Sequence, residues 1–161
     1  MLIRLLLLLV ITLTAVLLLA GQWGLLRGKA PSDLGVHDGK FKPPSKTENS
    51  VSSQAALYPD HPMRAYAEIA PIVFSGDAAA AWTRLQNAVA TLPRTSVITD
   101  TGTYLYVQQT TLMLRFTDDV EFALDAANSV IHVRSASRLG RKDFGVNRAR
   151  IETIRAAFKA S

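Results

Sequence analysis

Acidic and basic side chains that could cooperate in chemistry gather on two neighbouring segments of the sequence. Asp118, Asp119 and Glu121 follow one another closely, and Arg134 and Arg138 come after a predicted turn. Paired carboxylates can bind a divalent cation or act as general acid and base. On adjacent strands the same residues can instead form salt bridges that fix the register, each exposed pair contributing about 1 kcal/mol at most. The sequence favours salt bridges, because no second set of ligands accompanies the carboxylates.

A second candidate feature is the loop 137–147, which contains glycines and several charged residues and leads into a predicted helix. Its backbone N–H groups could hold a phosphate or a carboxylate. The favoured alternative is an ordinary strand-to-helix connection with Asn147 as the helix cap, and the glycine spacing differs from that of nucleotide-binding loops. Together the two segments predict one polar binding face, formed by Asp118, Asp119, Glu121, Arg134, Ser137, Arg138, Gly140, Asp143, Asn147 and Arg148.

The composition excludes several kinds of active site. The chain has 161 residues and no cysteine, which excludes disulfides, thiolate metal sites and a cysteine nucleophile. Its histidines, His37, His61 and His132, share no metal-binding spacing, and no serine lies in a Gly-x-Ser-x-Gly motif. The net charge of +5 suits an anionic partner, but the basic residues lack the interleaved aromatics typical of nucleic-acid binding. We predict no catalytic residue, no metal, no cofactor and no nucleic-acid partner.

The elements expected to position the charged residues are two strands joined by a short loop. Apolar and polar residues alternate over 120–125 and again over 130–134, on either side of a loop at 126–129. Closing the hairpin there pairs apolar residues on one face and charged residues on the other, open face. The predicted pairs are Leu124–Ile131, Phe122–Val133 and Glu121–Arg134, with Asp118 and Asp119 near Ser137 and Arg138.

The remaining periodicity predicts an α+β fold. Short apolar runs predict strands at 72–74, 96–99 and 103–109, and another strand or a bent continuation at 112–116. One helix is expected from Asp77 until Pro93 ends it, and a second follows Asn147 and buries one apolar stripe. We expect a mostly antiparallel sheet with the two helices packed on one face.

The first residues predict a membrane-spanning helix. Residues 5–26 are almost all apolar and number about twenty, which is the span of a hydrocarbon core. Leu18-Leu19-Ala20 does not fit a signal-peptidase site, which favours an uncleaved anchor over a signal peptide. Basic residues flank both ends, so the positive-inside count is nearly tied. The very short tail before the helix favours a cytoplasmic amino terminus and a periplasmic or otherwise extracytoplasmic domain.

The chain is thus expected to have three parts. Residues 1–26 form the anchor, residues 27–70 an extended tether and packing arm, and residues 71–161 the α+β domain. The second part is rich in proline, and its stretch 42–53 is low in apolar residues, as in an extended linker.

Five blocks occur in one order along the chain. They are Leu34-Gly35-Val36-x-Asp38-Gly39, Asn49-x-Val51-Ser52-Ser53-Gln54, Phe116-x-Asp118-Asp119-Val120-Glu121-Phe122, Val133-Arg134-Ser135-x-Ser137-Arg138-x-Gly140 and Asp143-x-Gly145-Val146-Asn147-Arg148-x-Arg150. In this order they resemble the domain of unknown function 1499 family, over a range from about Leu34 to Phe158. The resemblance implies a protein of bacterial envelopes or plastids and carries no established activity.

Relatives in that family commonly have two cysteines where this chain has Pro44 and Ser50. The resemblance therefore implies that this chain holds its arm by packing alone, or that its arm is looser. The function we predict is that of a membrane-anchored, non-catalytic module that binds an unknown protein or a small anionic ligand. The alternative is a metal-assisted envelope hydrolase that uses the carboxylates of Asp118 and Asp119. A third possibility is a purely structural role in an envelope assembly.

Overall fold

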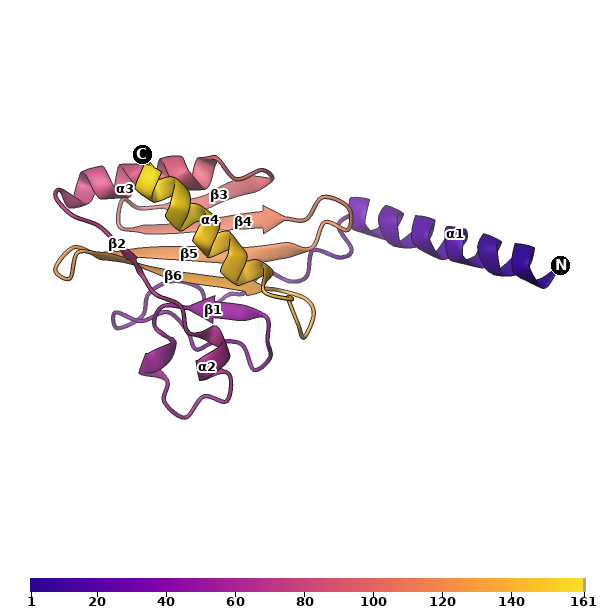
Figure 1. The fold of residues 1–161 in the computed structure, drawn as a ribbon, viewed down its shortest axis with the longest axis horizontal. Coiled ribbons are helices and arrows are strands. Elements are labelled where there is room, and N and C mark those ends of the chain that lie inside the picture. Colours follow the sequence, from indigo (N-terminus) through magenta and orange to yellow (C-terminus); the bar gives the residue numbers. More distant parts are fainter. Residues whose placement is uncertain (161) are drawn as a thin grey trace.

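The structure, a computed structural model, describes residues 1–160 and has an antiparallel sheet, helices packed beside it and a projecting amino-terminal helix (Figure 1). The helices are α1 (Leu2–Gln22), α2 (Arg64–Ala67), α3 (Ala78–Ala90) and α4 (Val146–Ala160), with a 3-10 turn, η1, at Ala55–Leu57. The strands are β1 (Ser50–Ser52), β2 (Ile72–Val73), β3 (Thr95–Asp100), β4 (Tyr104–Thr110), β5 (Thr117–Asp125) and β6 (Val130–Ser137). The predicted α+β class is confirmed.

The sheet has the strand order β1-β6-β5-β4-β3, and β2 also pairs with β6. All of these pairs are antiparallel. The register of β5 against β6 is the predicted one, with Phe122 opposite Val133 and Glu121 opposite Arg134. The alternation of apolar residues was sufficient to fix this register, because a slip by one residue would exchange the two faces.

One face of the sheet carries the hydrophobic core, and we call it the apolar face. The strands contribute Leu105, Val107, Val120, Phe122, Ile131 and Val133 to a single buried cluster, which also contains Trp82, Leu85 and Val89 of α3 and Ile151, Ile154 and Phe158 of α4. The first turn of α3 is capped as expected, because the Asp77 side chain accepts a hydrogen bond of 2.8 Å from Ala80 N.

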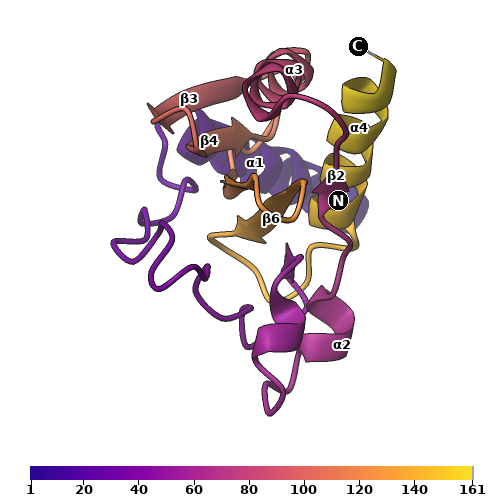
Figure 2. The ribbon, with the colours of Figure 1, turned by 90° about the vertical axis from the view of Figure 1, so that its left-hand side faces the viewer.

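The segment 27–49, called the arm below, runs along the opposite face of the sheet (Figure 2). It leads into β1, which adds to the edge of β6 by pairing Val51 with Ser135. This differs from the extended tether expected at 42–53. Val51 is buried in the core, and β6 supplies partners for its backbone, but three residues of strand are too few to produce a recognisable periodicity.

Hydrogen bonds hold the arm around Pro44 and Ser50, where the resemblance implies cysteines in relatives. Ser45 N donates to Ser50 Oγ at 2.8 Å, beside the buried Pro44. Phe41, fully buried, donates its N–H to Gln54 Oε1 at 2.7 Å, and Tyr58 donates its hydroxyl to the Phe41 carbonyl. The arm is therefore fixed by packing and by buried polar contacts together.

Residues 112–116, where another strand or a bent continuation was predicted, form the loop between β4 and β5 instead. Thr111 N donates to Phe116 O at 2.9 Å, which closes the loop, and Arg115 adopts a positive φ of 58°. Leu112 and Met113 at its tip are 66% and 61% exposed. Apolar composition alone suggested a strand here, but these side chains have no core to pack against.

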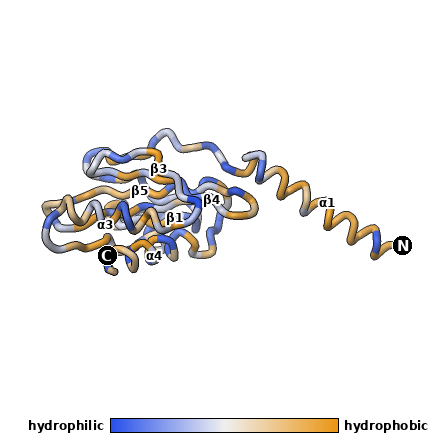
Figure 3. Tube along the Cα trace, turned by 90° about the horizontal axis from the view of Figure 1, so that it is seen from above, coloured by the Kyte–Doolittle hydropathy of each residue, from blue (hydrophilic) through white to orange (hydrophobic). Residues whose placement is uncertain are grey.

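Helix α1 is hydrophobic over nearly its whole length and projects from the rest of the molecule (Figure 3). In residues 1–160 it is the one helix long and apolar enough to cross a membrane. It meets the body at Gly21, where a Cβ would come within 2.7 Å of the Leu114 carbonyl oxygen. Gln22 also donates from Nε2 to Met113 O at 3.3 Å. The end of α1 thus packs against the backbone of the β4–β5 loop.

Candidate functional site

The face of the sheet opposite the core is polar, and we call it the polar face. Strand alternation directs Asp119 and Glu121 of β5 to this face, together with Arg134 of β6. β4 supplies Tyr104 and Tyr106, which pair with Ala123 and Glu121 in the ladder. The arm lies over these side chains, so the face expected to be open is in fact largely covered.

Glu121 and Arg134 form a buried ion pair at the centre of the polar face. Arg134 Nη1 donates to Glu121 Oε2 at 2.9 Å, and Glu121 is 0% exposed. The other carboxylate oxygen, Oε1, accepts from Gly35 N of the arm at 2.8 Å and from the Tyr104 hydroxyl at 3.0 Å. Burial and the adjacent Glu121 charge both raise the pKa of Tyr104. Glu121 therefore connects three separate segments and stays paired.

A second pair joins Asp119 to Arg138, just beyond the end of β6. Arg138 binds the carboxylate with two nitrogens, Nε to Oδ2 at 2.9 Å and Nη2 to Oδ1 at 2.7 Å. The Tyr106 hydroxyl donates to Asp119 Oδ1 at 2.5 Å. Hydrogen bonding to Asp119 raises the pKa of Arg138, and burial raises the pKa of Tyr106, with the hydrogen bond to Asp119 adding to it. All these contacts hold the guanidinium in one orientation.

A cavity of about 370 Å³ lies between the arm and this part of the polar face. Its charged lining residues are Lys29, Asp33, Lys42 and Lys46 from the arm and Asp119, Arg134 and Arg138 from the sheet. Lys42 is paired with Asp33 at 2.6 Å. Among residues 1–160, neither Lys29 nor Lys46 has an ion-pair partner. The lining therefore has a net positive charge.

Arg134, one of the residues that line this cavity, has an unpartnered donor. Its Nε is buried, and no atom of residues 1–160 accepts a hydrogen bond from it. A buried donor left without a partner costs about 1–3 kcal/mol, and more when it carries charge. Arg134 therefore has a hydrogen-bonding capacity that residues 1–160 do not use.

Asp118 lies on the other side of β5 from Asp119, which corrects the single face predicted for the two carboxylates. It accepts from Arg150 Nη2 of α4 at 2.5 Å, and both side chains are almost fully buried. Because adjacent residues of a strand point to opposite faces, the two carboxylates cannot share one cation. Within residues 1–160, no group of three or more His, Asp or Glu side chains is arranged to hold a metal ion.

Asn147 is the centre of the polar cluster around Asp118, which we call the helix-side cluster. Its Oδ1 accepts from Arg150 Nη1 and from Ser135 Oγ, both at 2.6 Å. Its Nδ2 donates to Asn49 O at 3.1 Å and to Asp143 Oδ2 at 2.8 Å. The cluster connects the start of β1, the end of β6 and the first turn of α4. Asn49 Oδ1 is a buried acceptor without a partner in the described chain.

The loop before α4 does not present a free anion site, because a side chain of the loop occupies it. Asp143 accepts from Gly145 N at 3.1 Å and from Asn147 N at 2.9 Å. Asp143, and not Asn147 as expected, thus caps α4. Although burial opposes it, hydrogen bonds from Tyr66, Asn147 and Gly145 lower the pKa of Asp143. The same environment, chiefly burial, raises the pKa of Tyr66 to about 12.

The ten residues predicted as one face therefore divide into separate groups. Asp119, Glu121, Arg134 and Arg138 lie on the polar face, whereas Asp118, Ser137, Asp143 and Asn147 belong to the helix-side cluster. Gly140 accepts from Asn49 Nδ2 at 2.7 Å, and Arg148 donates to Tyr66 O at 2.6 Å.

The residues that sequence reasoning missed are Tyr104, Tyr106, Arg150 and the lysines of the arm. Period-two alternation in β4 could have placed both tyrosines on the polar face. No signal in the sequence places the arm above it, because that contact spans distant segments.

One row of side chains has the residue types of a catalytic triad. Ser53 Oγ lies 3.2 Å from His132 Nδ1, and His132 Nε2 lies 3.7 Å from Asp125 Oδ2. The second separation is longer than a hydrogen bond, and Ser53 Oγ already accepts from Val133 N at 2.9 Å. This row attaches the chain after β1 to β6 and gives no support for nucleophilic catalysis.

Comparison with known families finds one family model that matches this chain. A family model described as "Protein of unknown function (DUF1499)" matches residues 40–158, which is most of the chain. No curated protein matches the sequence. The matched range contains both ion pairs of the polar face and the whole helix-side cluster, while α1 and Gly35 precede it. The chain belongs to this family, as its resemblance predicted.

Proposed function

We propose that this member of the DUF1499 family is a membrane-anchored, non-catalytic module that binds a small anionic ligand between the arm and the polar face. The observation that carries the proposal is Arg134, which lines a basic cavity and whose Nε is a buried cationic donor without a partner in residues 1–160. The described pairs fix Arg134 and Arg138 in place before any ligand arrives. A preorganised site of this kind avoids the cost of ordering its side chains on binding.

The division of the sheet into two faces is part of this proposal. We infer that α3 and α4 both pack on the apolar face, which leaves the polar face to the arm and the ligand. Support comes from the core cluster, which joins side chains of both helices to the same face of β4, β5 and β6.

Anchorage by α1 is the second part of the proposal. The helix has 21 residues, which corresponds to about 31 Å, close to the thickness of a hydrocarbon core. We infer that it remains attached and that the domain lies outside the cytoplasm, in the bacterial envelope. Because the chain has no cysteine, a single cysteine introduced at the exposed Ala127 tests on which side of the membrane the domain lies. Labelling by an impermeant maleimide in intact cells is expected, and labelling only after lysis would contradict the orientation.

Calorimetric titration of the full chain in detergent with inorganic phosphate tests the ligand site. We expect saturable binding that Lys46→Gln weakens about fivefold, because one unpaired charge beside the cavity contributes about 1 kcal/mol. The matched control is Lys40→Gln, an exposed lysine of the arm outside the cavity lining. Equal weakening by both substitutions, or no phosphate binding at all, would contradict the proposal.

A further inference from the structure

The end of the body beside α1 carries a second basic cavity, whose lining shares only Arg138 with that of the proposed ligand cavity. It has a volume of about 650 Å³ and is lined by Arg27, Arg94, Arg115 and Arg138, with no acidic residue in the described lining. Arg138 is neutralised by Asp119, but Arg27, Arg94 and Arg115 have no ion-pair partner in residues 1–160. Three uncompensated guanidinium groups therefore face one space.

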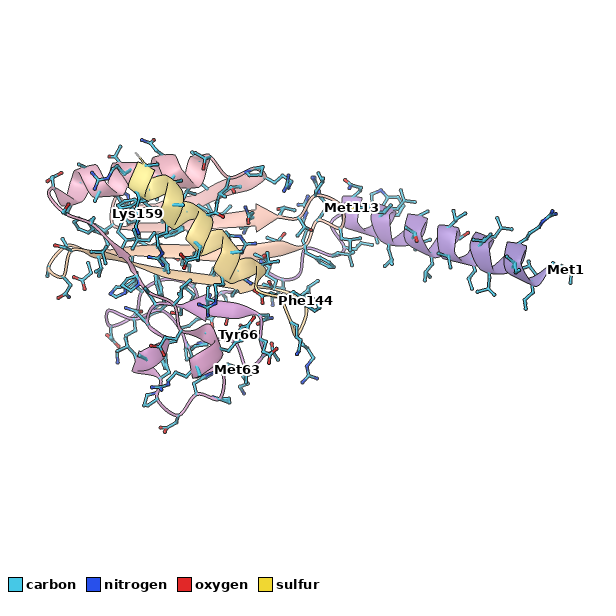
Figure 4. The ribbon with its side chains drawn as sticks, in the orientation of Figure 1. Met1, Met63, Tyr66, Met113, Phe144 and Lys159 are labelled. Carbon is cyan, nitrogen blue, oxygen red and sulfur yellow. The ribbon has the colours of Figure 1, made fainter. Side chains whose placement is uncertain are left out.

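Apolar side chains project from the loops at the same end. Leu112 and Met113 extend from the β4–β5 loop, and Phe144, which is 92% exposed, extends from the β6–α4 loop. Figure 4 shows Met113 where its loop meets α1, and Phe144 at the same end of the sheet. Large apolar residues this exposed near unpaired cations are typical of surfaces that enter the headgroup region of a bilayer.

If α1 crosses the membrane, its contact with the β4–β5 loop fixes the position of these residues along the membrane normal. Gly21 is the next-to-last residue of α1 and touches the backbone of Leu114. Trp23 follows the helix and is exposed, as is common for tryptophan at a membrane interface. A span that ends at Gln22 therefore places the β4–β5 loop at the membrane surface.

We propose that this end of the body is a membrane-docking surface, in which Leu112, Met113 and Phe144 insert between lipids while Arg27, Arg94 and Arg115 hold an anionic phospholipid headgroup. The inference rests on the proposed anchorage by α1. It is independent of the anionic ligand between the arm and the polar face. Docking would hold the domain in one orientation against the bilayer, because the surface adds contacts on one side of the single anchor.

Single-cysteine probes in the full chain test insertion. An environment-sensitive dye is attached at Met113→Cys, at Leu9→Cys within α1, or at Ala127→Cys in the exposed β5–β6 turn, and the protein is reconstituted in vesicles of phosphatidylcholine and phosphatidylglycerol. Blue-shifted emission and quenching by lipid-borne quencher are expected at Met113 and Leu9, and aqueous behaviour at Ala127. A lipid-buried Leu9 with an aqueous Met113 would overturn the docking surface and leave the anchor standing. Aqueous behaviour at both would overturn the anchor as well.

The lipid that copurifies with the full chain from the mixed vesicles tests the headgroup site. Removing two cations from the surface, by Arg94→Gln with Arg115→Gln, is expected to reduce the preference for phosphatidylglycerol over phosphatidylcholine about thirtyfold. The control is Arg64→Gln with Lys159→Gln, which removes two exposed cations elsewhere. An unchanged preference in the first variant, or an equal reduction in the control, would overturn the assignment of the headgroup to these arginines.

Discussion

Asp118 and Asp119 are neighbours in the chain, yet their surroundings on the two sides of β5 differ in kind. Asp118 and its partner Arg150 belong to the helix-side cluster, which joins the start of α4 to two strands. Asp119 and its partner Arg138 lie beside a cavity whose other wall contains unpaired lysines. Both pairs are almost fully buried, so burial alone does not distinguish a structural pair from a ligand site.

The two regions differ in which kind of buried polar atom, donor or acceptor, lacks a hydrogen-bond partner. The helix-side cluster pairs its donors with its own acceptors through Asn147 and Asp143, and the atom it leaves without a partner, Asn49 Oδ1, is an acceptor. The polar face leaves Arg134 Nε without an acceptor beside a basic cavity. An unpartnered acceptor offers nothing to an anion, whereas an unpartnered cationic donor in a residue that lines a cavity is suited to one.

The largest effect is expected from breaking the helix-side cluster. Arg150→Ala leaves Asp118 charged and unpaired in the interior, and it should lower the free energy of unfolding by about 3–5 kcal/mol. Urea unfolding followed by fluorescence of the buried Trp82 measures the loss. Arg148→Ala on the same helix loses one hydrogen bond to Tyr66 O and should cost only about 1 kcal/mol. Equal small losses would show that the cluster does not support the fold.

The next effect separates binding from stability on the polar face. The double variant Glu121→Gln with Arg134→Met removes both charges, so its free energy of unfolding should change by only about 1–2 kcal/mol. Phosphate binding should fall at least about tenfold, because the cationic donor is gone. The matched variant on the other face, Asp118→Asn with Arg150→Met, should keep its phosphate affinity. Similar losses in both doubles would remove the distinction between the faces.

A smaller effect depends on pH and reports on the cap of α4. Burial and the hydrogen bond to Asp143 raise the pKa of Tyr66 from 10.0 to about 12. The folded state therefore holds this proton more tightly than the unfolded state does. The stabilisation is complete below pH 10 and is lost as the pH rises through about 12. Unfolding measured over this range should show a decline in wild type that is reduced in Tyr66→Phe. A difference between the two proteins that is constant with pH would contradict this linkage.

The smallest effect concerns the attachment of the arm. Ser50→Ala removes the acceptor of the Ser45 N–H group and should reduce stability by about 0.5–1.5 kcal/mol. It should also weaken phosphate binding slightly, because the lost hydrogen bond holds Ser45, the residue next to Lys46. The exposed Ser75 provides the control, because Ser75→Ala should change neither quantity. A loss of the same size at Ser75 would show that the measurement does not report on the arm.

The alternation of apolar residues predicted the hairpin of β5 and β6 correctly, down to the pairs Glu121–Arg134 and Phe122–Val133. The same reasoning failed for 112–116, because apolar composition does not state whether a core is present for the side chains to fill. It also failed for β1, a strand of three residues that depends on the edge of β6. Local patterns were informative where the partners are close in sequence.

The candidate site was predicted only in part for the same reason. Charge identified Asp119, Glu121, Arg134 and Arg138, but it grouped Asp118 with them, although strand alternation separates adjacent residues. The sequence predicted Asn147 as the cap of α4. In the structure Asp143, which precedes the helix, accepts from Asn147 N, and the sequence does not specify the loop geometry that brings them together. The cavity requires the arm to lie over the sheet, a contact between segments distant in the chain.

The central claim is that an anion binds at Arg134 and not at the helix-side cluster, and NMR of arginine side chains tests it most directly. The Nε–H resonances of Arg134 and Arg150, assigned from Arg→Lys variants, are followed while inorganic phosphate is added to the full chain in detergent. Arg134 should shift in a saturable manner, because its Nε gains an acceptor, while Arg150 stays constant because Gln109 Oε1 already accepts from its Nε. A constant Arg134 resonance, or equal shifts of both, would contradict the account.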